Sequence, residues 1–152
     1  MGAIGRILDQ LKRVQEGPAW HGPPLKELLS GVSAPKAAAR PAGGAHSIWE
    51  LVNHMAVWDA VAIERLRGEN PQIAIGDVRD WPPVTDASEA AWQAAIAHLY
   101  AGHQRLRDAV AAFPEARLDA ISPTGRYTFY AEIHGVVQHA VYHAGQIALL
   151  KK

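Results

Sequence analysis

The apolar residues of this chain recur with the three- and four-residue spacing of amphipathic helices, not with the two-residue alternation of strands. Four long segments show this periodicity, and each is bounded by residues that favour helix ends. They are residues 3–16, about 47–67, about 87–113 and about 128–152. The pattern therefore predicts an all-α fold with four long helices.

The segments between these helices are long and rich in Gly and Pro. The first connection, residues 17–46, is expected to hold two short helices near residues 25–29 and 35–39. Residues 68–86 and 114–127 form the other two connections. Four long helices with lengthy crossings predict a four-helix bundle that forms one domain over residues 1–152. Connections of this length often cover functional sites.

One helix start is marked by a recognisable motif. The "SIWE" sequence at 47–50 is a capping box, in which the Ser47 hydroxyl accepts from the Glu50 amide while the Glu50 side chain reaches back to Ser47. The "DASE" sequence at 86–89 is a second expected cap.

Composition and charge narrow the function classes. Fifteen Lys and Arg balance fifteen Asp and Glu, so no basic field attracts nucleic acid. The chain has no Cys, which excludes disulfides, thiolate metal sites and a cysteine nucleophile. The N-terminal residues do not resemble a signal peptide, and no uncharged run approaches the roughly 18 residues that span a bilayer. We therefore expect a cytoplasmic protein with no membrane or nucleic-acid partner.

Two histidines in the last predicted helix are candidate metal ligands. His139 and His143 are four residues apart and share one helix stripe with Gln146 in a strongly apolar segment. Burying two imidazoles without partners is costly, because each has a donor and an acceptor. A divalent metal would satisfy one nitrogen of each ring. The pair lacks the glutamate of the H-E-x-x-H motif, so the spacing does not indicate a zincin.

The second long helix offers a third ligand. His54 lies on an apolar face of that helix between Leu51 and Trp58. The other histidines fit less well, because they lie on the wrong helix face, on a different helix without a partner, or in a connection; they are His21, His46, His98, His103 and His134. The residues favour His54, His139 and His143 as a metal site.

The segments "HSIWELVNHMAVWDA" and "QHAVYHAGQIALL" resemble the DinB/YfiT-like superfamily of four-helix-bundle metalloproteins. The resemblance extends over essentially the whole chain. It implies an up-down-down-up bundle that binds a divalent metal such as zinc or nickel through His54, His139 and His143. Similar proteins include transferases that use small thiols such as bacillithiol or mycothiol, and a thiol-dependent isomerase. Relatives that pair through helices also imply a homodimer.

Three histidines leave a metal position open for water or substrate, as in catalytic sites. With such an open position, the resemblance implies a metal-dependent enzyme that transfers a low-molecular-weight thiol to a small electrophilic substrate. A metal-water hydrolase and a non-catalytic, stress-associated metal-binding module are the alternatives. Glu50, one turn before His54, is a candidate ligand or base that the capping box explains equally well. Gln146, one turn after His143, is a candidate for orienting a ligand or water.

Two further residues have expected structural roles. Trp81, in the "DWPP" segment, is the aromatic residue that we expect to cover the site. Gly145 lies inside the last helix, where Gly costs about 1 kcal/mol relative to Ala. We therefore expect it to permit a close approach of another helix.

Overall fold

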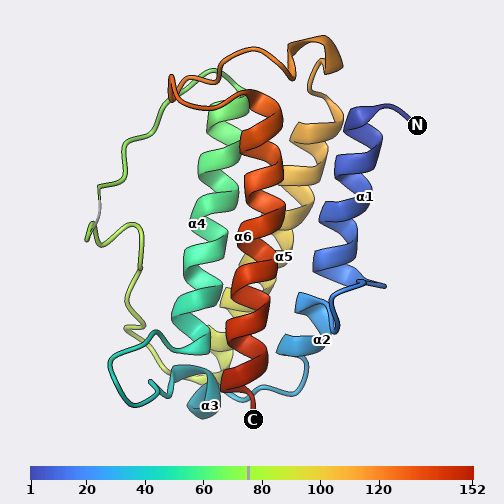
Figure 1. Ribbon diagram of the computed structural model, residues 1–152. Coiled ribbons are helices and arrows are strands. Elements are labelled where there is room, and N and C mark those ends of the chain that lie inside the picture. The colour runs from blue at the N-terminus through green and yellow to red at the C-terminus, as the bar shows by residue number, and fades with distance from the viewer. Residues whose placement is uncertain (75) are drawn as a thin grey trace.

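The protein is helical throughout the part of the chain that the structure, a computed structural model, describes, residues 1–74 and 76–152 (Figure 1). Its elements are α1 (Ala3–Glu16), α2 (Leu25–Leu29), α3 (Ala34–Ala38), α4 (Ile48–Leu66), α5 (Glu89–Ala111), the short 3-10 helix η1 (Glu115–Arg117) and α6 (Phe129–Leu150). Within these residues there is no strand, and extended pairing is limited to an isolated bridge between Ile121 and Thr128. The prediction of an all-α protein is confirmed.

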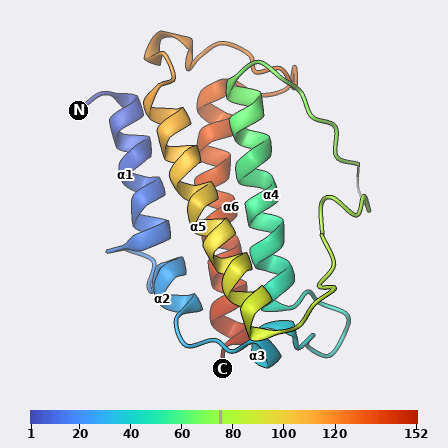
Figure 2. The same cartoon turned by 180° about the vertical axis from the view of Figure 1, so that it is seen from behind.

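The long helices α1, α4, α5 and α6 lie side by side (Figures 1 and 2). In Figure 1, α1 and α6 run from top to bottom, whereas α4 and α5 run from bottom to top. Helix α4 packs against α3, α5 and α6, and α1 packs against α2, α5 and α6. Helices α5 and α6 pack against each of α1 and α4, so these contacts join all four long helices.

The helix starts follow the local sequence closely. The capping box is present at α4, where the Ser47 hydroxyl accepts from the Glu50 amide at 3.2 Å and Glu50 accepts from the Ser47 amide at 2.9 Å. Ser88 and Thr128 cap α5 and α6 through their side-chain oxygens. Each long helix therefore begins within two residues of its predicted start.

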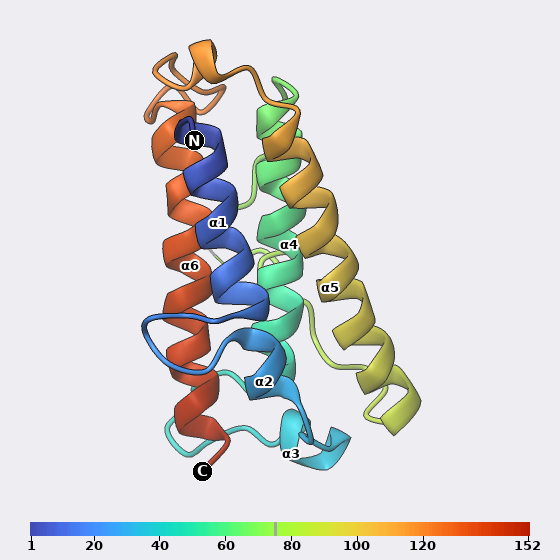
Figure 3. The same cartoon turned by 90° about the vertical axis from the view of Figure 1, so that its right-hand side faces the viewer.

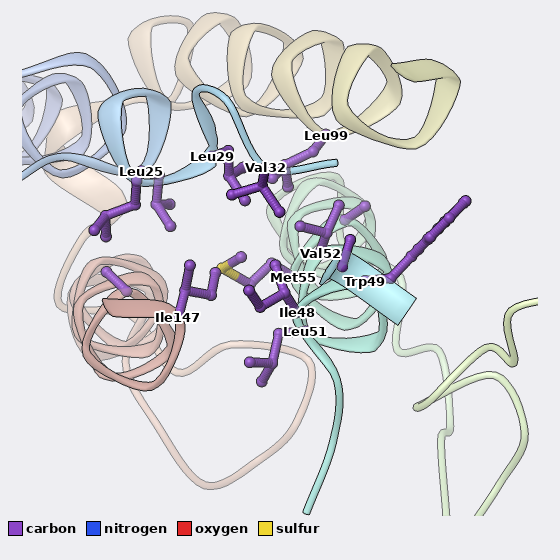
Figure 4. Packing of buried hydrophobic residues seen from close by; sticks show 14 of the residues in the cluster. Leu25, Leu29, Val32, Ile48, Trp49, Leu51, Val52, Met55, Leu99 and Ile147 are labelled. Atoms are coloured by element: carbon purple, nitrogen blue, oxygen red, sulfur yellow. The ribbon is translucent and has the colours of Figure 1, made fainter. Parts of the chain in front are cut away.

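The apolar core has two parts. One cluster surrounds Met55 and joins α2, α3, α4, α5 and α6; Leu25, Val52, Leu99 and Ile147 are among its members (Figure 4). The short helices α2 and α3 lie below α1 in Figure 3 and supply the apolar side chains that α1 is too short to provide there. A second cluster joins α1, α4, α5 and α6 towards the other end and includes Leu11, Leu66, Leu106 and Ile133.

One structural expectation is wrong. Gly145 is exposed, and a Cβ atom built on it meets no atom within 4 Å. Its place in α6 therefore does not arise from a close helix approach. The helical glycine that does contact another helix is Gly102 of α5, whose built Cβ lies 3.6 Å from Asp59 Oδ2 of α4.

Among the described residues, no helix combines the length and apolar character that a bilayer span requires.

Candidate metal centre

Helices α4 and α6 bring three histidines together. His139 Nε2 lies 2.9 Å from His54 Nε2 and 2.9 Å from His143 Nε2. All three nitrogens lie within 4.8 Å of one another, and they form a group that could hold a metal ion. His54 and His143 are buried, and His139 is half-buried. These are the three histidines that the sequence singled out.

The outer nitrogens of two of these rings meet oxygen acceptors. His54 Nδ1 lies 2.8 Å from the Asp80 backbone oxygen and 3.1 Å from Asp80 Oδ1. His143 Nδ1 lies 2.5 Å from Gln146 Oε1. Since an oxygen acceptor requires an N–H partner, both Nδ1 atoms carry the ring proton. Their Nε2 atoms therefore present lone pairs to the centre of the group, as metal-binding imidazoles do.

Counting protons tests whether these residues fit a metal. His139 Nε2 can share one proton with either His54 or His143, but not with both. In at least one of the two contacts, two nitrogen lone pairs then face each other across 2.9 Å without a proton to share. A cation at the centre removes this conflict, and three neutral imidazoles are a suitable ligand set for a divalent transition metal. The donor set fits the metal.

Protonation does not relieve the conflict at neutral pH, because the pKa of every ring is lowered. Burial, and then the neighbouring His143 and His54, lower the pKa of His139 to about 3. Burial also lowers the pKa of His54 and of His143, against the opposing effects of Asp80 and Gln146 respectively. The rings are therefore neutral, which is the form that binds metals.

Trp81 covers one side of the group. Its ring stacks on His54 with centroids 3.8 Å apart and on His46 with centroids 3.5 Å apart, nearly parallel in both cases. The covering position predicted for Trp81 is the one observed. His46 was set aside as a ligand, and it packs beside the site on the other face of Trp81.

The segment that carries Trp81 is attached to α4 by hydrogen bonds. Trp58 Nε1 donates to Asp80 Oδ1 at 2.8 Å, and Asn53 Nδ2 donates to the Pro82 oxygen at 3.4 Å. Together with the His54 contact, these bonds fix the crossing between α4 and α5 over the site. Asp80 was not identified from the sequence, although it directly precedes the residue that was.

Glu50 lies next to the site but has other partners. Its carboxylate accepts from the Ser47 amide and from Arg40 Nε at 3.1 Å, and Arg40 Nη2 makes a second, shorter contact. Burial would raise the pKa of Glu50, but the Arg40 and Ser47 hydrogen bonds outweigh it and lower the pKa. The group that could hold a metal ion, as found among the described residues, does not include Glu50. Its catalytic role, like that of Gln146, stays a prediction.

A cleft of about 600 Å³ opens beside the histidines. It lies between α4 and α6; the residues that line it include His54, Trp58, Arg65, Tyr127, Glu132 and His139. Because two of the three candidate ligands reach its surface, a molecule in the cleft would lie beside the metal position.

Comparison with known proteins decides the family. Residues 23–147 match the DinB superfamily. The chain belongs to the DinB superfamily. No curated protein and no solved structure matches it. The matched range includes all three histidines of this DinB-superfamily chain and the "DWPP" segment that covers them.

Proposed function

We propose that this chain is a metal-dependent enzyme that transfers a low-molecular-weight thiol to a small electrophile. The observation that carries the proposal is the convergence of three neutral imidazoles at the edge of a cleft. A divalent ion held there, zinc or nickel, would supply Lewis acidity that keeps a thiol deprotonated at neutral pH. The chain contains no Cys, so the sulfur must come from a second molecule.

The residues around the group have separate tasks in this proposal. His54, His139 and His143 hold the ion, while Asp80 and Gln146 keep the protons of two rings on their outer nitrogens. Trp81 excludes water from one side of the group. The cleft receives the electrophile on the side that Trp81 leaves open. In the transfer, sulfur bonds to the electrophilic carbon, the thiol proton passes to solvent, and a leaving group departs with its bonding electrons.

The bundle topology belongs to the same proposal. The up-down-down-up order implied by the resemblance is supported by the helix directions in Figure 1, where α4 and α5 run opposite to α1 and α6.

The first test is metal content, measured by elemental mass spectrometry on untagged protein. We expect about one equivalent in the parent and none in a folded variant that combines His54→Ala, His139→Ala and His143→Ala. The matched control combines His21→Ala and His98→Ala, both at exposed positions, and should retain the metal. A parent that takes up neither zinc nor nickel would rule the enzyme out.

The second test separates the three functions. Cobalt is substituted for the native ion, and small thiols are added while the absorption spectrum is recorded. A thiolate-to-cobalt charge-transfer band, together with product formation only when thiol is present, supports the transferase. Ester or amide cleavage without thiol indicates the hydrolase instead. Complete unfolding on chelation, with no exchangeable position on the cobalt, indicates the non-catalytic module.

A further inference from the structure

An ion pair lines the cleft beyond the histidines. Arg65 Nη1 lies 2.9 Å from Glu132 Oε2, and both side chains face the same cleft as His54 and His139. The Arg65 side chain is 20% exposed and the Glu132 side chain 12%. Because both side chains are partly removed from water, the desolvation cost offsets much of their attraction, and the pair contributes little net stability. The pair therefore invites a functional explanation.

The carboxylate of this pair is held in a fixed position. Glu132 Oε1 accepts from Ser122 Oγ at 3.1 Å and from Thr124 Oγ1 at 3.0 Å, while Oε2 accepts from Arg65. The connection before α6 thus supplies two hydroxyls that orient a single carboxylate. Such support is typical of a binding group that must be oriented before the ligand arrives.

By contrast, the guanidinium of Arg65 has N–H donors that Glu132 does not use. Within the described residues its hydrogen bond to Glu132 uses Nη1, and Nη2 makes none; Nε also has no partner, but it is buried and is not available to a ligand. A guanidinium has five N–H donors and matches a carboxylate with two parallel bonds. The side of Arg65 that faces the cleft is therefore suited to a ligand carboxylate.

Trp58 connects this ion pair with the candidate metal centre. Its ring centroid lies 6.2 Å from that of His54 and 6.3 Å from that of His139, and the Arg65 guanidinium carbon lies 5.5 Å from the Trp58 ring. Its hydrogen bond to Asp80 fixes the indole. A ligand lying along Trp58 from the histidines to Arg65 would span about 12 Å at most, the length of three to four extended residues.

We propose that Arg65 and Glu132 form a subsite for a zwitterionic α-amino-carboxylate group at the far end of the ligand. The ligand carboxylate accepts from Arg65, and its ammonium donates to Glu132. Because the ion pair has no net charge, it matches a head group that has none either. A head group with a carboxylate but no ammonium is repelled by Glu132, and one with an ammonium but no carboxylate is repelled by Arg65. The subsite extends the proposed function by giving the thiol a polar, peptide-like end.

The test uses a probe that carries the head group but no thiol. γ-Glutamylalanine is titrated into zinc-loaded protein by calorimetry, and the indole N–H signal of Trp58 is followed by NMR. We expect measurable binding with a shift of that signal. Two analogues, one N-acetylated and one with an α-carboxamide in place of the γ-glutamyl carboxylate, should each bind roughly tenfold more weakly, because each loses one charged hydrogen bond.

Variants identify the residues. Arg65→Gln, Glu132→Gln and the double variant are compared with Arg67→Gln, an exposed arginine at the C-cap of the same helix. The first three should weaken γ-glutamylalanine binding by roughly tenfold or more and retain the metal; Arg67→Gln should match the parent. If either single substitution impairs folding, the double variant is used instead, because its two glutamine side chains can still hydrogen-bond to each other. The subsite would be overturned if all variants bound γ-glutamylalanine equally well or if the three probes bound equally well. It would also be overturned if no binding were seen at about 10 mM probe.

Failure of this proposal is distinguishable from failure of the thiol transferase. If simple thiols give the cobalt charge-transfer band while γ-glutamylalanine does not bind, the subsite is wrong and the transferase stands. If γ-glutamylalanine binds through Arg65 and Glu132 while no thiol perturbs the cobalt, the transferase is wrong and the subsite stands.

Discussion

The imidazoles of His54 and His143 each depend on a neighbouring residue for their orientation. For His143 that residue is Gln146, whose Oε1 accepts from Nδ1. Gln146→Leu would leave this N–H without an acceptor and free the ring to rotate. We expect metal affinity to fall roughly 10- to 100-fold, the usual effect of removing an outer partner of a ligating histidine.

Competition with a chromogenic chelator measures this affinity. Gln146→Glu restores an acceptor and should recover most of it. Gln93→Leu, at an exposed position on α5, controls for the general effect of the substitution. Unchanged affinity in Gln146→Leu would show that the contact does not orient the ring.

The candidate ligands were predictable from the sequence because their helices impose simple geometry. His139 and His143 are four residues apart, and His54 lies among apolar residues of α4. Asp80 was not predictable for a physical reason. Its main contact to His54 uses a backbone oxygen, which every residue type has, and it crosses 26 positions of the sequence.

The crossing between α4 and α5 covers one side of the site with the ring of Trp81. Trp81→Ala would remove the stacking on both His46 and His54 and open that side of the group to water. We expect the metal to leave several-fold faster in the presence of excess chelator, with the helix content unchanged in circular dichroism. Trp20→Ala removes a fully exposed indole and should leave the release rate at the parent value; equal rates in both variants would contradict the covering role.

The start of α4 gives a second test at the level of elements. Ser47→Ala removes the capping oxygen of the helix that carries His54, and we expect it to lower the free energy of unfolding by about 1 kcal/mol. Ser33 occupies the same position at the start of α3 but makes no side-chain capping bond. Ser33→Ala should therefore change the urea midpoint much less, and an equal loss in both variants would mean that the capping box contributes nothing.

Two other helix starts show what the sequence could not reveal. The Ala3 amide of α1 donates to Glu115 Oε1 at 3.0 Å, and the Ala34 amide of α3 donates to Glu89 Oε2 at 2.8 Å. These carboxylates lie 112 and 55 positions away from the amides that they cap. Local motifs such as the capping box are readable, whereas a cap supplied by a distant residue depends on the packing of the finished bundle.

Across the whole molecule, polar groups separate the two apolar clusters. Asp59 of α4 lies between residues of one cluster and those of the other, and His103 of α5 does the same. Asp59 Oδ2 is 3.5 Å from His103 Nε2, and both side chains are buried. Burial raises the pKa of Asp59 to about 8, against the opposing charges of Arg105 and Arg107. Burial, and then Arg107, lower the pKa of His103 to about 3.

These pKa values predict a loss of stability with rising pH. Between about pH 6.5 and 8, the folded pair holds one proton, whereas the unfolded Asp and His hold none. Stability then falls by about 1.4 kcal/mol per pH unit. Below this window, down to about pH 4, both states hold one proton and the contribution is constant.

Urea unfolding in the presence of a chelator, at pH 7, 7.5 and 8, measures the effect. The lowered pKa values of the three candidate ligands affect stability only below about pH 6.5, so they do not interfere. Asp59→Asn should remove the decline, while Asp119→Asn, at an exposed position, should preserve it. A parent whose stability is flat from pH 7 to 8 would show that the buried pair is not protonated as stated.

The stack of His46, Trp81 and His54 also has an optical consequence. An indole in contact with a ring that binds nickel, cobalt or copper loses fluorescence to the ion, because energy and electron transfer are efficient at that separation. Trp81 is one of five tryptophans, and its ring lies against His54 at 3.8 Å. The protein thus contains its own reporter of occupancy, whose emission can be isolated as the difference between the parent and Trp81→Phe.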